Sequence, residues 1–173
     1  MKKKVLLFLG ISFVLLFGAV FAYVSSVQYK VDTTDDNEPV AEVDPKNRTV
    51  AYLNKDAQLS DIKKEKGKVN IYMFWGNGCP HCKAQWEYLE ALRSEYPNDF
   101  NVYGFEVWYN KSNLELLTQF ATAMGDGDAN SVPYTIIGDK SYEGAQSEAT
   151  LTGAIKKYKD AGIDVYFDKI NKM

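Results

Sequence analysis

The sequence has only two cysteines and one histidine among its 173 residues. No second group of cysteine and histidine residues exists, which argues against a structural zinc site, because such a site takes four ligands. A single cysteine pair also excludes the dense disulfide framework of small secreted domains. Lysine and arginine number 20 against 23 aspartates and glutamates, a formal net charge of −3 that offers no basic patch to nucleic acid. We therefore expect proteins as partners, and no nucleic acid.

Both cysteines and the histidine lie in one short segment, residues 74–82. The Cys-Pro-His-Cys stretch follows an apolar run and begins a helical pattern, which is typical of a redox dithiol. With Cys79 as the N-cap and Pro80 as the first helical residue, the first sulfur would lie at the positive end of a helix, where a thiolate is stabilised. Cys82 would lie one turn deeper on the same face, as the shielded, resolving thiol. Metal ligation and a purely structural disulfide are the competing interpretations, and the second is weak because so small a loop restricts the unfolded chain little.

The stretch from Cys79 to Cys82 resembles the active-site motif of the DsbA-type thiol oxidases in the thioredoxin superfamily, where it follows a buried strand. This resemblance implies thiol-disulfide exchange at Cys79 and Cys82. It also implies that Pro80 and His81, the dipeptide between them, adjust the redox potential. The alternative for His81 is an exposed side chain without a role.

A second part of the sequence, Val132 and Pro133, resembles the proline loop of the same superfamily. The resemblance implies a cis proline packed against the active-site cysteines, with the preceding residue in contact with substrate. An ordinary trans proline at the start of a strand is the alternative, because few X-Pro bonds are cis. We expect Val132, Pro133 and Trp75, which precedes the cysteine motif, to bind substrate.

Two features depart from the DsbA-type pattern. Only 50 residues separate Cys82 from Pro133, which leaves room for one strand and one helix but not for the helical insertion of those oxidases. In addition, Met73 lies six residues before Cys79, where thioredoxins and DsbA-type proteins have a buried acid that assists proton transfer. The expected body is thus the size of a thioredoxin, and the acid-assisted step is not expected to carry over.

The N-terminal region, residues 1–24, has the pattern of a membrane signal. Three lysines precede 20 uncharged residues, enough to span a bilayer of about 30 Å at about 1.5 Å per residue, with the positive end in the cytoplasm. We expect a retained anchor and hence a single-pass protein of the cell membrane with its domain outside. Cleavage near Ala22 would instead give a secreted protein. Residues 25–48 are polar and acidic and predict a flexible tether.

Residues 49–173 predict one α/β domain. Apolar runs indicate strands at residues 49–53, 69–75 and 100–108, and a further strand between Pro133 and Gly138 begins a hairpin that reaches Tyr142. Helices are predicted around residues 59–62, over residues 80–95, from a capping box at Ser112 to Gly125, and between Gly144 and Gly162. This order is similar to the thioredoxin fold, with a central mixed sheet of four to five strands flanked by helices.

Taken together, the motif and the export signal predict an enzyme, a thiol-disulfide oxidoreductase that acts on exported cysteine-containing proteins. A disulfide-forming oxidase is the first hypothesis, and it would need a membrane redox partner to reoxidise the pair. An extracytoplasmic reductase or isomerase is the alternative. A non-catalytic, thioredoxin-like module that binds exported peptides is a third. No cofactor or metal is expected.

Overall fold

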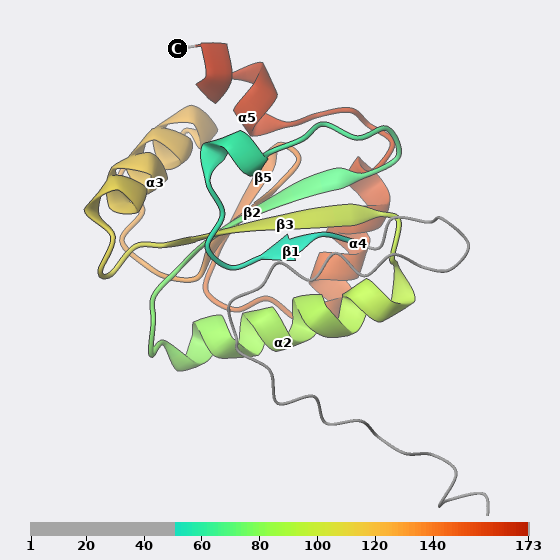
Figure 1. Cartoon of the computed structure of the whole chain (residues 1–173), viewed down its shortest axis with the longest axis horizontal. Helices are drawn as coiled ribbons and strands as arrows, with labels where there is room; N and C mark the ends of the chain where they lie inside the picture. Colours follow the sequence, from blue (N-terminus) through green and yellow to red (C-terminus); the bar gives the residue numbers. More distant parts are fainter. Residues whose placement is uncertain (1–50, 173) are drawn as a thin grey trace, which may run out of the picture. The chain divides into compact units, whose positions relative to one another are not determined.

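The computed structural model describes residues 51–172, which are built around a five-stranded mixed sheet (Figure 1). The sheet has the order β1-β3-β2-β4-β5. Its strands are β1 (Leu53–Asn54), β2 (Val69–Trp75), β3 (Phe100–Glu106), β4 (Tyr134–Ile137) and β5 (Lys140–Glu143). Strand β3 runs parallel to β1 and β2, whereas β4 is antiparallel to β2 and β5. The sheet has five strands, at the upper end of the predicted range.

The register of the sheet brings three strand ends together. Phe74, near the end of β2, pairs with Phe105 of β3 on one side and with Tyr134 of β4 on the other. Because β4 runs in the opposite direction, its first residue lies beside the last residues of β2 and β3. Loops that follow β2 and β3 therefore meet the loop that precedes β4 at one edge of the sheet.

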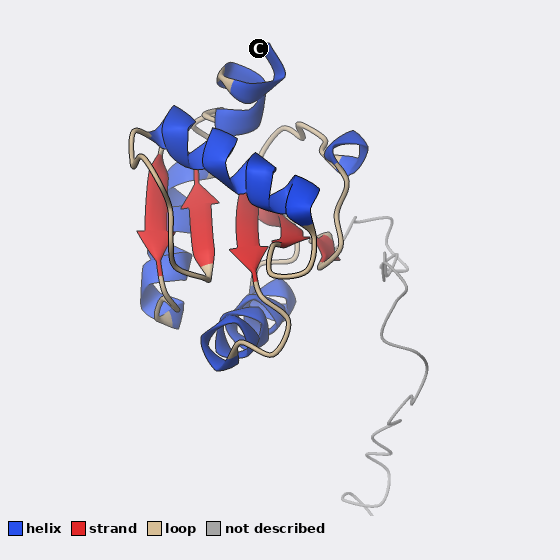
Figure 2. Cartoon of the chain, turned by 90° about the vertical axis from the view of Figure 1, so that its left-hand side faces the viewer, coloured by secondary structure: helices blue, strands red, loops and turns tan. Residues whose placement is uncertain are grey.

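Helices cover both faces of this sheet (Figure 2). The helices are α2 (Pro80–Glu95), α3 (Lys111–Met124), α4 (Glu148–Tyr158) and α5 (Val165–Asp168), with short 3-10 turns η1 (Leu59–Asp61) and η2 (Ile170–Lys172). On β2, Ile71 and Met73 pack in the core shared with α2 and α4, and Tyr72 and Phe74 in the core shared with α3 and α5. Strand β2 is therefore buried on both faces, as its continuous apolar run predicts.

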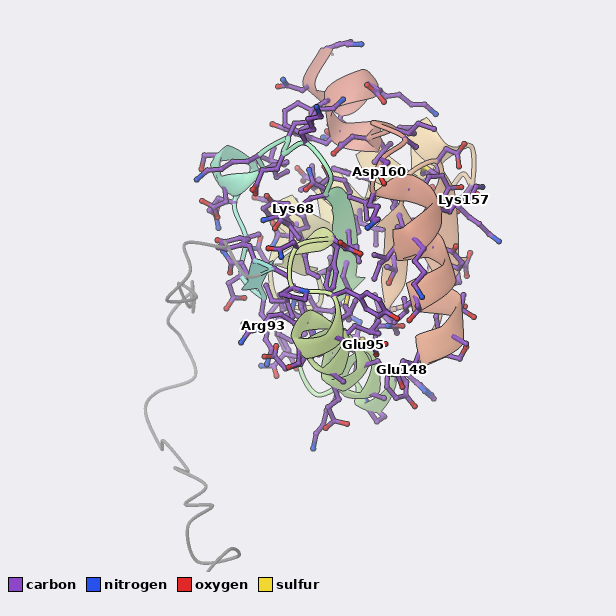
Figure 3. All side chains as sticks on the ribbon, turned by 90° about the vertical axis from the view of Figure 1, so that its right-hand side faces the viewer. Lys68, Arg93, Glu95, Glu148, Lys157 and Asp160 are labelled. Atoms are coloured by element: carbon purple, nitrogen blue, oxygen red, sulfur yellow. The ribbon has the colours of Figure 1, made fainter. Side chains whose placement is uncertain are left out.

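Helix α2 has the predicted bounds and inward face. Cys82, Trp86 and Leu89 are buried, and the chain leaves the helix at Tyr96, just before Pro97. Figure 3 looks onto the C-terminal end of α2, where Arg93 and Glu95 lie, with α4 packed beside it. The cysteine motif is at the opposite end of α2, over the edge where the three strand ends meet.

Several local predictions were wrong. The first strand is Leu53–Asn54 rather than residues 49–53, of which 49 and 50 lie outside the described residues. The predicted helix around residues 59–62 is only the turn η1, because the Asp61 carboxylate accepts a hydrogen bond from the Gln58 amide and closes a single turn. The strand predicted over residues 100–108 stops at Glu106.

The cap of α3 and the C-terminal segment also differ from the predictions. Asn110, not Ser112, caps α3, since its side chain accepts a hydrogen bond from the Asn113 amide. Helix α4 ends at Tyr158, short of Gly162, and it is not the last helix, because α5 and η2 follow it. The predicted membrane segment, residues 1–24, and the tether, residues 25–48, lie outside the described residues. Within residues 51–172 no helix is both long enough and apolar enough to cross a membrane.

Candidate active site

Cys79 lies in the turn between β2 and α2 and forms the N-cap of the helix. Its sulfur accepts a hydrogen bond from the Cys82 amide at 3.2 Å, and its own amide donates to the Gly76 carbonyl at 3.0 Å. Pro80 occupies the first helical position, where its missing N–H leaves no donor unpaired. The predicted cap geometry is confirmed. A negative charge on the Cys79 sulfur would face the amide groups of the first helical turn.

Cys82 is the more deeply buried thiol, with 1% of its surface exposed against 6% for Cys79. Burial, followed by its hydrogen bond with Cys79, raises the pKa of Cys82 to about 12. The predicted shielding of Cys82 is therefore confirmed. Cys82 therefore keeps its proton at neutral pH.

The proline loop before β4 lies beside the first cysteine. The Val132-Pro133 peptide bond is cis, as predicted. The Cys79 thiol donates to the Val132 carbonyl oxygen, with the sulfur and oxygen 3.8 Å apart. The Gly144 amide donates to the Pro133 carbonyl at 2.8 Å and ties this loop to the end of β5. Val132 and Pro133, chosen from sequence, thus lie next to Cys79.

A groove of about 680 Å³ opens on the other side of the cysteine pair, along α2. Both cysteines line it, together with Trp75 and Trp86, whose rings stand perpendicular with centroids 6.3 Å apart. The Trp75 indole donates to the Lys55 carbonyl at 2.9 Å, which fixes one wall. The remaining walls carry charges of both signs: Lys55, Lys83, Glu87 and Glu90.

His81 is exposed on the first turn of α2 and is not among the residues that line this groove. Within residues 51–172 no three histidine, cysteine, aspartate or glutamate side chains are grouped to hold a metal ion.

The region behind the cysteine pair holds apolar side chains and the buried hydroxyl of Thr135, which pairs with Met73 in the sheet. Met73 is fully buried and lies beside Gly104 of β3, and the Trp86 ring packs over that glycine. The one buried acidic side chain within residues 51–172 is Asp164, which bonds to Asn70 and Tyr72 and so belongs to the core on the other face of the sheet. A proton on its way to or from Cys82 therefore has no buried carboxyl group in this core to pass through.

Sequence reasoning missed two residues next to the motif, Glu106 and Trp108. The Glu106 carboxylate accepts hydrogen bonds from three backbone amides, one of them Asn77 in the cysteine loop. The Trp108 ring lies against Gly76. The available signal was an acidic residue inside an apolar strand pattern, Phe100 to Trp108, with aromatic residues just after it.

The strand order, the cysteine pair at the start of α2 and the cis proline beside it define a thioredoxin-like α/β fold, as predicted. No family model and no curated protein matches the sequence. Among solved structures, an uncharacterized thioredoxin-like protein from Clostridium perfringens is 23% identical, over 61% of this chain and 79% of that one, with a TM-score of 0.47. A DsbF homologue from Corynebacterium diphtheriae is 16% identical over 72% of this chain and 99% of that one, with a TM-score of 0.42. A glutaredoxin from Archaeoglobus fulgidus is 26% identical over 51% of this chain and 87% of that one, with a TM-score of 0.37.

Proposed function

We propose that the protein is a thiol-disulfide oxidoreductase in which Cys79 and Cys82 are the redox pair, and that it forms disulfides in exported proteins. The observation that carries this proposal is the Cys79 sulfur itself. It caps α2, accepts the Cys82 amide at 3.2 Å and lies 3.8 Å from the Val132 carbonyl. A helix N-terminus favours the thiolate form of Cys79 and thereby the reduced pair, and a stabilised reduced pair makes a stronger oxidant.

The reaction is a two-electron exchange. A substrate thiolate attacks the Cys79 sulfur of the oxidised pair, the bond between Cys79 and Cys82 breaks, and Cys82 leaves and takes up a proton. A second substrate thiolate then attacks the substrate sulfur of this mixed disulfide, and Cys79 leaves as a thiolate. The substrate gains a disulfide, and its two electrons remain on the protein pair.

The proton that Cys82 needs has to come from outside the core, because Met73 replaces the acid expected there. Cys82 lines the groove along α2, and solvent in that groove is the source we propose. The raised pKa of Cys82 makes proton uptake favourable once it has left the disulfide. Val132 and Pro133 would hold the substrate chain on one side of Cys79, with Trp75 on the other.

The partners in this proposal are exported proteins with free cysteines and a membrane protein that reoxidises the pair. The lysines and the apolar run of residues 1–24 support placement at the outer face of the cell membrane, or secretion if the segment is cleaved. The thiol-disulfide exchange proposed for Cys79 and Cys82 requires no cofactor.

A reductase or isomerase is the second candidate, and one observation favours it. Only β3 and α3 lie between α2 and the proline loop, so the domain is as compact as a thioredoxin. A third candidate is a peptide-binding module without catalysis.

The reduction potential of the Cys79/Cys82 couple in the full-length protein, measured by equilibration with glutathione, separates the first two candidates. A reduction potential of about −120 mV is that of a strong oxidant, and one of about −270 mV is that of a reductant. A Cys79→Ser variant that kept full biological activity would refute both and leave the peptide-binding module.

A further inference from the structure

The loop between β3 and α3, residues 107–110, is fastened to the cysteine loop by Glu106. The Glu106 carboxylate accepts hydrogen bonds from the amides of Asn77 at 3.2 Å, Trp108 at 2.9 Å and Tyr109 at 3.0 Å. The Val107 amide also donates to the Trp75 carbonyl at 2.8 Å. One carboxylate therefore sets the conformation of its own loop and its distance from the cysteine loop.

This arrangement holds Trp108 over the turn that carries Cys79. A Cβ atom on Gly76 would come within 2.2 Å of the Trp108 ring, so the indole occupies the space that a side chain at Gly76 would fill. The Gly76 carbonyl in turn accepts the Cys79 amide at 3.0 Å. Gly76 therefore contacts both the Trp108 ring and the backbone of Cys79.

Although it is held in place, Trp108 remains 53% exposed, and the neighbouring Tyr109 is 80% exposed. Within residues 51–172 no other two consecutive residues both have large, exposed, apolar side chains. Rigid, partly exposed tryptophan and tyrosine side chains are the residues that most often dominate binding energy at protein interfaces, because little conformational entropy is lost when they are covered.

We propose that Trp108 and Tyr109 form a binding surface for the polypeptide segment next to the substrate cysteine, with Glu106 as the residue that positions them. The inference rests on the proposed function. Strand β2, which leads to Cys79, lies between β4 and β3 in the sheet. A substrate chain that binds the proline loop before β4 and is bonded to Cys79 would therefore continue across the end of β3. An extended chain advances about 3.3 Å per residue, so residues one to three positions from the cysteine reach this surface. The occupant is therefore an unfolded, cysteine-containing polypeptide with an aromatic or long aliphatic residue near the cysteine.

The test compares three reductants of the oxidised full-length protein: a dithiol peptide with phenylalanine beside its cysteines, the same peptide with serine there, and dithiothreitol. Trp108→Ala should lower the ratio of the phenylalanine-peptide rate to the dithiothreitol rate about tenfold and leave the ratio of the serine-peptide rate to the dithiothreitol rate unchanged. Tyr109→Ser should act in the same sense, and at 80% exposure it does not disturb folding. Tyr88→Ala is the matched control, an exposed aromatic nine residues after Cys79 on α2, and should change none of the three rates.

Glu106 is tested as a positioning residue through the ratio of the phenylalanine-peptide rate to the dithiothreitol rate. Glu106→Ala should lower this ratio, and Glu106→Gln, which keeps one acceptor oxygen, should restore part of it. In a Trp108→Ala, Tyr109→Ser background the Glu106→Gln change should have no further effect on the ratio. Unchanged phenylalanine-peptide rates in Trp108→Ala and Tyr109→Ser, or equal losses with all three reductants, would overturn the binding surface. A wild-type protein that oxidises the serine peptide no faster than glutathione disulfide does would instead refute the proposed function itself.

Discussion

The indole ring of Trp86 lies directly against Gly104, so closely that a Cβ atom on the glycine would come within 2.5 Å of the ring. The same Cβ atom would also lie 2.8 Å from the Lys55 carbonyl oxygen, which is backbone and cannot turn away. Gly104 pairs with Met73 in the sheet, so this contact lies behind the cysteine pair. The absent side chain therefore lets α2 approach the sheet at the active site.

Substitution of Gly104 by alanine should overpack this contact. We expect Gly104→Ala to lower the free energy of unfolding by about 1 to 3 kcal/mol, measured by urea denaturation. Gly153 is the matched control, because it lies inside α4 with no atom within 4 Å of an added Cβ. Gly153→Ala should raise the same free energy by about 0.5 to 1 kcal/mol. If both substitutions changed the free energy of unfolding in the same direction, this account of Gly104 would be contradicted.

The two thiols should differ in reactivity. In the reduced native protein at pH 8, iodoacetamide should modify Cys79 and spare Cys82, because the reagent attacks thiolates and burial raises the pKa of Cys82 to about 12. Cys79 and Cys82 lie on the same tryptic peptide, residues 69–83, so fragmentation of that peptide in the mass spectrometer identifies the modified residue. Both cysteines should react after denaturation, which serves as the control. Equal modification of the native protein would show that Cys82 is not shielded.

The raised pKa of Cys82 also predicts a dependence of stability on pH. The folded protein keeps this proton up to about pH 12, whereas the unfolded chain loses it near pH 9.0, the ordinary pKa of a cysteine. The stabilising contribution is therefore complete below about pH 9 and is lost as the pH rises towards 12. The reduced wild type should lose stability more steeply between about pH 9 and pH 10.5 than Cys82→Ser. Tyr103, whose pKa burial also raises to about 12, is present in both proteins, so its contribution cancels.

The parts of the fold that the sequence predicts well are those with strong local signals. The continuous apolar run of β2 and the proline at the start of α2 each predict one element. Each signal depends on a few consecutive residues, because burial on both faces requires an apolar run and the helix N1 position favours proline. The placement of Val132 and Pro133 beside Cys79 followed from the family resemblance rather than from any local pattern.

The parts that were missed depend on contacts between distant residues. Strand β1 is two residues long and exists because it pairs with Val102 and Tyr103 of β3, which no local pattern reveals. The role of Glu106 depends on amides in two different loops. Asp164 was missed for the same reason, since its main partner is 92 residues earlier in the chain.

Asp164 should be a large contributor to stability. Its buried carboxylate accepts the Tyr72 hydroxyl at 2.7 Å and the Asn70 amide at 2.8 Å, and it caps α5 through the Tyr166 and Phe167 amides. Asp164→Ala would leave the buried Tyr72 hydroxyl without its acceptor, leave the Asn70 amide with its bond to the Lys63 carbonyl, and remove a cap. The expected loss is about 3 to 5 kcal/mol by urea denaturation. Asp160→Ala, an exposed aspartate in the same connection, should cost less than about 0.5 kcal/mol. Similar losses for both would show that the buried hydrogen bonds do not matter.

The last prediction concerns His81, the exposed residue between the two cysteines. A histidine beside the Cys79 thiolate can stabilise it by charge when protonated and by an N–H donor when neutral, and both effects add to that of the helix N-terminus. Both favour the reduced pair. His81→Ser removes them and keeps Pro80, so the couple should become more reducing by about 30 mV, a tenfold shift in its equilibrium with glutathione.

The control for His81 removes another basic side chain, that of Lys83, from the same turn. Lys83 already lies 3.9 Å from Glu87, so Lys83→Ser should shift the potential less than His81→Ser does. If the two variants shift the reduction potential equally, the shift is caused by the loss of any basic side chain at the start of α2 and not by the histidine in particular. If His81→Ser leaves it unchanged, the histidine has no part in the redox balance, and the oxidase direction loses the residue that distinguishes this motif from that of a reductant.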